Sequence, residues 1–270
     1  MSNKGGVRMS KKATRENHLL SVLSTTHRMT TAEAVELLGI SVATVRRLFN
    51  ELEHKGLIVR NYGGIQLPGA PQDYSFESSE KVYSQEKRTI GATAAALVQD
   101  GDTIFLDSGT TLMQMTLALS QRIAGGDFRS LNVVTNSIAN IQVLSPSPQV
   151  RVILLGGEYN HNRRDFSGPL TERFVAPFHF TKSFFGCEGL APEMGFSSNQ
   201  LSISSLNTCI LARTDKRYVL LDDSKFGRYS LVTYAALKEI TSIVTNAAPD
   251  EALAQALEEA KVTTILAKEG

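Results

Sequence analysis

The chain has 270 residues, with 28 Lys and Arg against 27 Asp and Glu, two cysteines and no tryptophan. This length predicts about two domains, and 42% hydrophobic with 20% charged residues excludes a disordered, collagen-like or low-complexity chain. No apolar run approaches the roughly 20 residues that span a bilayer. The basic first residues lack the apolar core of a signal peptide, and two cysteines are too few for a disulfide scaffold. We therefore expect a cytoplasmic protein without a membrane partner.

The near-zero net charge hides a difference between two parts of the chain. Residues 1–62 hold ten Lys and Arg against five Asp and Glu, whereas residues 63–270 hold eighteen against twenty-two. A small basic segment joined to a mildly acidic body is typical of a nucleic-acid-binding head. Chance clustering with a basic tail is the alternative interpretation.

Three short helices are predicted in the basic segment, over residues 15–26, 31–38 and 42–55. Thr30 or Thr31 is a suitable N-cap for the second helix, Gly39 ends it, and Ser41 caps the third. Two short helices joined by a turn that contains glycine predict a helix-turn-helix.

The third of these helices carries the candidate DNA contacts. Val45, Phe49 and Leu52 recur at helical spacing and are expected to pack inward. The opposite face begins with small residues and carries two arginines, which bond to guanine or to phosphates. The residues predicted to contact DNA are Ser41, Ala43, Thr44, Arg46, Arg47 and Asn50. A solvated amphipathic helix is the alternative.

A β-hairpin is predicted directly after the third helix, with short β-type runs over residues 57–60 and 65–67. Such a hairpin is the wing of a winged helix-turn-helix, and we expect Arg60 and Gly63 to contact phosphates there. A plain connecting hairpin is the alternative. The Pro- and Gly-rich run 68–71 breaks regular structure. It predicts a boundary between a DNA-binding domain, residues 1–72, and a second domain, residues 73–270.

The second domain alternates strand-like and helix-like segments. Seven apolar, β-branched runs cover residues 103–107, 132–135, 150–155, 180–185, 218–221, 240–245 and 263–267. Helical patterns between them include residues 86–98, 111–119, 138–144, 201–212 and 250–260. This alternation predicts an α/β fold, with a mostly parallel sheet covered on both faces. Right-handed crossovers place the strand-to-helix loops at one edge, where such sheets bind ligands.

The loops after these strands combine hydroxyls, glycines and a lysine. A helix start rich in hydroxyls and preceded by glycine can bind an anion, and a lysine neutralises phosphate as a point charge. Asp107 and Asn136 are expected to bond ligand hydroxyls, and Ser137 is also a suitable helix cap. The predicted ligand is a phosphorylated sugar or polyol, held in one hollow by Asp107, Ser108, Gly109, Thr110, Thr111, Asn136, Ser137, Gly156, Gly157 and Lys225. Local capping and turn chemistry is the alternative for each loop.

Other patterns argue against cofactor chemistry. The sequence has no P-loop and no convincing dinucleotide fingerprint, and its five histidines show no metal-ligand spacing. We expect no cofactor, no metal and no catalytic residue. Cys187 and Cys209 are expected to be small buried hydrophobes. The pair Arg163-Arg164 predicts a solvated loop, with contact to a phosphate as the alternative. The pair Asp222-Asp223 is compatible with metal binding or acid–base work, and equally with local bonding to the backbone or to Lys225.

Several of these stretches resemble the DeoR family of bacterial regulators. Ser41-Val42-Ala43-Thr44-Val45-Arg46-Arg47 is similar to the family's recognition-helix signature, and residues 56–64 are similar to its wing signature. In the second domain, the matching stretches are residues 107–111, 135–137, 156–157 and 222–227. Leu48 and Tyr62 stand where the family usually has Asp and His, and residues 199–205 lack its usual acidic residue.

The resemblance implies a winged helix-turn-helix joined to a Rossmann-like domain related to ribose-5-phosphate isomerase. It also implies a homo-oligomer, dimer or tetramer, that binds sugar phosphates and represses genes of carbohydrate uptake or catabolism. We therefore expect a transcriptional repressor, not an enzyme, whose partners are a double-stranded DNA operator and a sugar-phosphate effector. One alternative is a sugar-phosphate isomerase-like enzyme carrying a DNA-binding head, with Asp107 as its carboxylate. The other is a scaffold whose head binds protein.

Overall fold

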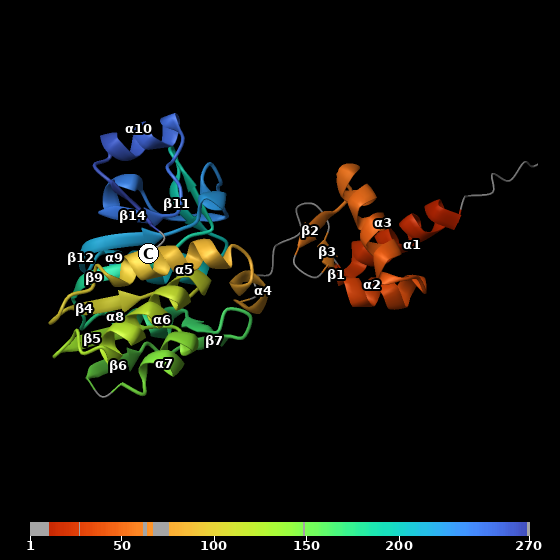
Figure 1. Ribbon diagram of the computed structural model, residues 1–270. Coiled ribbons are helices and arrows are strands. Elements are labelled where there is room, and N and C mark those ends of the chain that lie inside the picture. The colour runs from red at the N-terminus through yellow and green to blue at the C-terminus, as the bar shows by residue number, and fades with distance from the viewer. Residues whose placement is uncertain (1–10, 27, 62–63, 67–75, 148, 269–270) are drawn as a thin grey trace, which may run out of the picture. The chain divides into compact units, whose positions relative to one another are not determined.

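The computed structural model describes residues 11–268 apart from 27, 62–63, 67–75 and 148. The chain divides into two compact units, Met1–Asp73 and Tyr74–Gly270. Figure 1 colours the first unit red to orange and the second yellow to blue. Each unit has its own hydrophobic core, so each can be described by itself.

The first unit contains three helices and a small antiparallel sheet. Its elements are α1 (Lys11–Thr26), β1 (Arg28–Thr30), α2 (Thr31–Leu38), α3 (Val42–His54), β2 (Val59–Asn61) and β3 (Gly64–Gln66). The strands lie in the order β1-β3-β2. The structure confirms the predicted helices and the hairpin, which is β2–β3. The strand β1 was not predicted, because three residues are too short a run to show a period.

Capping side chains fix the turn between α2 and α3. The Thr30 N–H donates to Glu33 Oε2 at 2.7 Å, and the Glu33 N–H donates to Thr30 Oγ1 at 3.1 Å, which closes a capping box. Gly39 ends α2 with φ 61°, and Ser41 Oγ accepts the N–H of Thr44 at 3.3 Å to start α3. The inward face of α3 is buried as predicted, so its opposite face is directed to the surface.

The second unit is built on one parallel sheet. Its helices are α4 (Phe76–Glu80), α5 (Ser84–Ala95), α6 (Thr110–Ala124), α7 (Ile138–Leu144), α8 (Pro169–Val175), α9 (Leu201–Leu211) and α10 (Glu251–Glu259). The sheet strands are β4 (Thr103–Leu106), β5 (Leu131–Thr135), β6 (Val150–Leu154), β9 (Phe180–Gly186), β12 (Thr214–Leu220), β14 (Ser242–Thr245) and β15 (Thr263–Leu266). These are the seven runs that the sequence predicted, and all their pairings are parallel. The predicted α/β fold is therefore confirmed.

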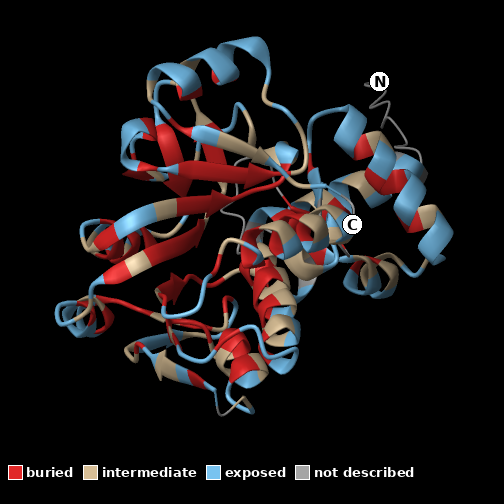
Figure 2. Ribbon diagram, turned by 60° about the vertical axis from the view of Figure 1, so that its left-hand side comes forward, coloured by how far each residue is buried: buried red, intermediate tan, exposed pale blue. Residues whose placement is uncertain are grey.

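Side chains alternate between the two faces of this sheet. On β4, Ile104 and Leu106 belong to one core cluster, which also holds apolar residues of α5, α6 and α7. Phe105 belongs to the other cluster, with residues of α8, α9 and α10. Helices thus cover both faces, and Figure 2 shows the central strands buried beneath them.

The smaller elements were not predicted. They are the hairpin of β7 (Glu158–Asn160) and β8 (Asp165–Ser167), and the antiparallel sheet of β10 (Gly189–Ala191), β11 (Gly195–Ser198) and β13 (Val232–Ala235). The helix α6 continues beyond its predicted end at residue 119 because Ile123 extends its buried apolar face. Among the described residues, no helix is long and apolar enough to span a membrane.

The order of the strands shows where a ligand site is expected in the second unit. The sheet runs β15-β14-β12-β9-β4-β5-β6, so the chain proceeds from β4 towards β6 and then resumes on the other side of β4 with β9. The loops after β4 and β9 therefore leave the sheet in opposite directions. Ligands of open parallel sheets bind beyond the carboxyl ends of the strands at such a switch point.

Candidate functional site

The predicted DNA-contacting residues lie on one exposed face of α3. Ala43, Arg46, Arg47 and Asn50 are exposed, as is the cap residue Ser41, and Thr44 is half-buried. Arg60, on β2, donates from Nη1 to Asn50 Oδ1, and its N–H donates to Glu53 Oε1 at 3.3 Å. The first wing strand is thus bonded to the exposed face of α3. Gly63 lies outside the described residues.

A hollow of about 350 Å³ lies beside this face, between α1 and α3. Its lining consists of Lys12, Arg15, Ile40, Thr44, Arg47, Leu48 and Glu51. Lys12 Nζ lies 2.6 Å from Glu51 Oε2, and the hydrogen bond from Lys12 lowers the pKa of Glu51. The first helix therefore adds two basic side chains next to the arginines of α3.

In the second unit, the loop after β4 leads into an uncapped helix. Gly109 has φ 117°, a conformation that side-chain-bearing residues rarely adopt. No side chain caps α6, which begins with the buried Thr110 and the half-buried Thr111. Because the first N–H groups of a helix have no partner within it, this end offers donors and a positive dipole to an anion.

Asp107, at the start of the same loop, is buried and hydrogen-bonded. Its Oδ1 accepts the N–H of Ser108 at 2.7 Å, and its Oδ2 accepts from Asn207 Nδ2 at 3.3 Å and from the N–H of Gly186 at 3.4 Å. Burial raises the pKa of Asp107 to about 6, against the opposing effect of the Arg163 guanidinium. The carboxyl group therefore titrates near neutral pH.

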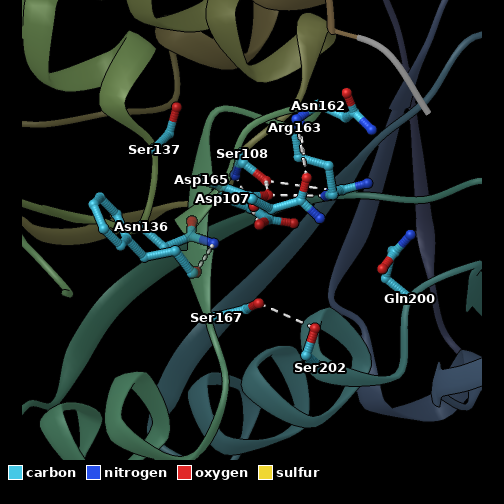
Figure 3. Close-up of polar contacts among 12 residues, drawn as sticks. Asp107, Ser108, Asn136, Ser137, Asn162, Arg163, Asp165, Ser167, Gln200 and Ser202 are labelled. Atoms are coloured by element: carbon cyan, nitrogen blue, oxygen red, sulfur yellow. Dashed lines mark hydrogen bonds and ion pairs between the residues drawn. The ribbon is translucent and has the colours of Figure 1, made fainter. Parts of the chain in front are cut away.

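Arg163 and Asp165 come to this loop from the β7–β8 hairpin. Arg163 Nε lies 2.9 Å from Asp165 Oδ2, its Nη2 donates to Ser108 Oγ at 3.3 Å, and its Nη1 lies 3.3 Å from Glu188 Oε1. Ser108 also donates to Asp165 Oδ2, and Figure 3 shows these side chains converging. We call Ser108, Arg163, Asp165 and Glu188 the Ser108 cluster.

The Ser108 cluster corrects one prediction. Arg163 was expected in a solvated loop, but its side chain is only 6% exposed. The reason is the β7–β8 hairpin, which folds back to the loop after β4 and pairs Arg163 with Asp165, two residues along the chain, and with Glu188, after β9. Arg164 is half-buried and pairs with Glu77 at 2.6 Å. Neither Asp165 nor Glu188 was predicted as a site residue, and no local pattern of the sequence marks them.

The loop after β5 contributes one of its two predicted residues to this place. Asn136 is fully buried, and its Nδ2 donates to the carbonyl of Phe166, on β8, at 3.1 Å. Ser137 Oγ caps α7 by accepting the N–H of Asn140 at 3.3 Å, as the capping interpretation predicted. In Figure 3 the Ser137 hydroxyl points away from the Ser108 cluster.

Three predicted residues lie apart from these contacts. Gly156 is half-buried with open space where a Cβ would stand, whereas a Cβ on Gly157 would lie 2.0 Å from Thr171 Oγ1. Packing against α8 therefore requires a glycine at 157. Lys225 is half-buried in the turn after β12, and its charge acts on Lys87 and Cys187. Within the described part of the chain, no hydrogen bond or ion pair joins Lys225 to the Ser108 cluster.

The remaining candidate groups have local roles. Cys187 and Cys209 are half-buried against the core, and burial raises the pKa of both thiols. Asp222 accepts the N–H of Ser224 at 3.1 Å, and Asp223 accepts from Asn246 Nδ2 at 2.9 Å, so this acidic pair bonds locally. Across the described residues, no group of three or more His, Cys, Asp or Glu side chains could hold a metal ion.

Two family profiles match the two units. The "DeoR-like helix-turn-helix domain" matches residues 15–69, and the "DeoR C terminal sensor domain" matches residues 83–247. The chain belongs to the DeoR family. It is accordingly a transcriptional regulator with a DNA-binding head, here called the head, and a sensor domain, here called the sensing unit.

Curated relatives match this DeoR-family chain over most of their own length and most of its length. It is 31% identical to the lactose phosphotransferase system repressor of Staphylococcus epidermidis, over 80% of this chain and 84% of the relative. It is also 31% identical to the HTH-type transcriptional repressor GlcR of Bacillus subtilis, over 89% and 90%. The glycerol-3-phosphate regulon repressor of Escherichia coli is 26% identical over 92% and 96%.

Among solved structures, the DeoR-family chain is similar to ribose 5-phosphate isomerase A of Methanocaldococcus jannaschii. That match has a TM-score of 0.41 and 15% identity, and it covers 53% of this chain and 55% of the isomerase.

Proposed function

We propose that the protein represses genes of carbohydrate uptake or catabolism and that a phosphorylated sugar or polyol controls it. The head binds a double-stranded operator in the cytoplasm. The sensing unit binds the effector at the carboxyl edge of its sheet, and the effector changes the affinity for DNA. The open N-terminus of α6 beside the Ser108 cluster is the observation that carries this proposal.

The phosphate binds at the start of α6. The N–H groups there, with the hydroxyls of Thr110 and Thr111, form a donor-rich place, and Gly109 provides the positive φ with which the chain enters the helix. Ser108 lies beside these groups, and its hydroxyl donates to Asp165. Asp107 and Asn136 lie next to the donor-rich place, whereas Ser137, Gly156, Gly157 and Lys225 lie apart from the Ser108 cluster and are proposed only as peripheral members of the site. The names of the relatives favour this ligand class, because one represses a lactose phosphotransferase system and another a glycerol-3-phosphate regulon.

A thermal-shift screen of the full chain tests the effector class. The panel is D-glucose 6-phosphate, D-fructose 6-phosphate, D-ribose 5-phosphate, sn-glycerol 3-phosphate and inorganic phosphate. A ligand at 100 times its Kd stabilises the native state by about 2.7 kcal/mol. At least one sugar or polyol phosphate should raise the melting temperature more than inorganic phosphate does. No shift with any compound in the panel would overturn the proposed effector.

The arginines of α3 test the operator function. Replacing both Arg46 and Arg47 with Ala should strongly weaken binding to DNA from upstream of the protein's own gene. Each lost phosphate contact should also flatten the dependence of log K on log salt by about 0.9. Arg129→Ala, an exposed arginine of the sensing unit, is the control and should bind normally. Unchanged binding by the double variant would refute the assignment of α3.

An effector can change the affinity for DNA only if it binds two arrangements of the protein with different affinities. We propose that the chain acts as a dimer or tetramer, in which the effector changes the relative placement of the heads and hence their fit to paired half-sites. Light scattering of the full chain checks this, since a monomer at micromolar concentration, with and without operator, contradicts it.

An isomerase-like activity is the second candidate, because a buried carboxyl with a pKa of about 6 is a plausible general base. Turnover of pentose and hexose phosphates by the full chain, abolished in Asp107→Asn, would support it. If the chain binds a sugar phosphate but turns over none of them, the isomerase-like activity is excluded and only the sensor function remains.

A further inference from the structure

Two buried acceptor atoms near Ser108 have no hydrogen-bond donor among the described residues. Asp165 and Asn136 are both 0% exposed. Within the described residues, neither Asp165 Oδ1 nor Asn136 Oδ1 has a hydrogen-bond partner. Figure 3 shows the Asn136 amide pointing towards the group formed by Asp107, Ser108 and Asp165. A buried acceptor without a donor is unfavourable, so each such atom needs an explanation.

The other atoms of the two side chains fix which end is open. Asn136 Nδ2 donates to the Phe166 carbonyl at 3.1 Å, which leaves Oδ1 as the open atom. Asp165 Oδ2 already accepts from Ser108 and from Arg163 Nε, which leaves Oδ1. Both open atoms are acceptors. An ionised phosphate offers acceptors, whereas the hydroxyls of a polyol offer donors.

We propose that Asp165 and Asn136 bind hydroxyl groups of the effector and thereby determine which phosphorylated compound is accepted. This rests on the proposed function, in which the start of α6 takes the phosphate. A site built to bond a hydroxyl rejects an analogue that lacks it far more strongly than an apolar pocket discriminates by size. Asp165 and Asn136 thus distinguish a sugar phosphate from inorganic phosphate.

Calorimetry with the full chain distinguishes contacts to the ligand's hydroxyl groups from contacts to its phosphate. The probes are the best-binding sugar or polyol phosphate of the panel above and inorganic phosphate. Asp165→Asn should weaken the sugar phosphate at least about tenfold and change inorganic phosphate less than about twofold. Glu188→Gln removes another carboxylate partner of Arg163 and is the matched control, with a smaller effect on the sugar. Asn136→Ala gives a second measurement if Asp165→Asn does not fold.

Each outcome has a distinct meaning. Equal losses for both probes, or no loss for either, overturn the hydroxyl assignment and leave the proposed function standing. A wild-type chain that binds no compound in the panel overturns the proposed function, and the assignment with it.

A separate set of contacts concerns α4, the first helix after the segment that leads from the head. The Phe76 N–H donates to the Asn162 carbonyl at 2.8 Å, and Arg164 pairs with Glu77 at 2.6 Å. The Arg164 guanidinium also lies 5.4 Å from the ring centroid of Phe76, which is 3% exposed. Two residues of the β7–β8 turn therefore hold the start of α4.

The residue between them belongs to the Ser108 cluster. Arg163 contacts Ser108 and Asp165, while its neighbours Asn162 and Arg164 contact α4. The end of α4 is held as well, because the Ser79 carbonyl accepts Lys87 Nζ at 2.6 Å. Asp222 and Lys225, after β12, act electrostatically on Lys87. The helix α4 is thus connected to the β7–β8 turn directly and to the segment after β12 through Lys87.

The geometry points to α4 as the element that couples the effector site to the head. A ligand that moves Arg163 or Asp165 displaces Asn162 and Arg164, and so releases or tightens the start of α4. Residues 67–75, which connect α4 to the head, lie outside the described residues. The coupling requires only that the β7–β8 turn has two conformations and that the ligand binds them with different affinities.

Hydrogen exchange tests this without any ligand. Asp165→Asn in the full chain should increase exchange of the backbone amides of residues 76–80 several-fold, and Glu188→Gln, which removes a partner of the same Arg163, should do so more weakly. No change at residues 76–80 in a folded Asp165→Asn variant overturns the coupling, whatever the effector is.

A second test uses the ratio of operator affinities with and without the bound panel compound. A regulator of this kind has a ratio of about 5–150. Phe76→Ala should bring the ratio to within about twofold of unity and leave the affinity for the compound nearly unchanged. Phe76→Leu keeps apolar burial and should retain most of the ratio. Glu77→Gln should lower it partly. A wild-type ratio in Phe76→Ala overturns the proposal.

Discussion

At the scale of single residues, the raised pKa of Asp107 makes the stability of the sensing unit depend on pH. Its pKa is raised from 3.8 to about 6, mainly by burial, so the folded state binds its proton more tightly than the unfolded state does. The stability this contributes is complete below about pH 4 and is lost as the pH rises through 6. The shift of roughly two pKa units corresponds to about 3 kcal/mol.

Asp107→Asn removes this titration and should flatten the pH dependence. Relative to the variant, the wild-type sensing unit should lose about 2.4 kcal/mol of unfolding free energy between pH 4 and pH 7. Denaturant unfolding at a series of pH values measures the difference. Parallel curves for the two proteins would show that Asp107 is not the titrating group.

Gly109 provides a second prediction at this scale. A Cβ there would meet nothing within 4 Å, so Gly109→Ala adds backbone strain without a clash. Such strain costs about 1–3 kcal/mol, and the start of α6 should shift and weaken phosphate binding about tenfold by calorimetry. Gly101, with φ 82° and equally open space, gives the matched control. Gly101→Ala should lose similar stability and bind phosphate normally; equal binding losses would disprove the site.

The sequence predicted some site residues and not others for a physical reason. Ser108 and Asn136 follow strands, and parallel topology alone brings strand ends to one edge. Arg163 and Asp165 follow no strand of that sheet. A hairpin carries them back, and their burial depends on ion pairs formed only in the folded chain. Periodicity reports on faces of local elements and carries no information about such pairs.

At the scale of elements, helix ends in this chain divide into capped and open ones. Side chains of Thr30, Ser41, Ser137 and Asp250 cap α2, α3, α7 and α10, whereas α5, α6, α8 and α9 have no side-chain cap among the described residues. The capped ends stabilise the fold, and the open end of α6 lies in the proposed site.

The capping box of α2 can be tested directly. Thr30→Ala leaves the N–H of Glu33 without its partner and should destabilise the head by about 1 kcal/mol. Thr30→Ser keeps the accepting hydroxyl and should recover most of this loss, while Glu36→Gln, on the exposed surface of the same helix, should be neutral. Thermal unfolding of the full chain followed in the head measures all three. A Thr30→Ala variant as stable as the wild type would refute the role of the box.

Element prediction succeeded where burial imposes a period. The seven strands of the parallel sheet are buried apolar runs and were found, although their bounds differ by a few residues. The strands β1, β7, β8 and β10 have three residues each. Such short strands show no reliable alternation; β2 and β3 are equally short but were predicted, because the Gly-Gly turn in the sequence between them marks a hairpin. The hairpin that carries Arg163 and Asp165 is in this group, which is why the burial of Arg163 and the role of Asp165 escaped prediction.

At the scale of the whole molecule, the two separate cores predict two unfolding transitions. A ligand stabilises the unit that binds it, so operator DNA should raise the head transition, and a sugar phosphate at 100 times its Kd should stabilise the sensing unit by about 2.7 kcal/mol. Calorimetry of the full chain, with each ligand and with both, resolves the two effects. A single transition that either ligand shifts as a whole would contradict independent cores.

The effect of one ligand on the binding of the other is the more informative measurement. Coupling is reciprocal, so the effector must change operator affinity by the same factor by which the operator changes effector affinity. With both ligands present, the transitions should therefore depart from the sum of the separate shifts by about 1–3 kcal/mol. If α4 carries the coupling, Phe76→Ala abolishes this departure and keeps both direct shifts. A departure that persists in Phe76→Ala would place the coupling in another part of the protein.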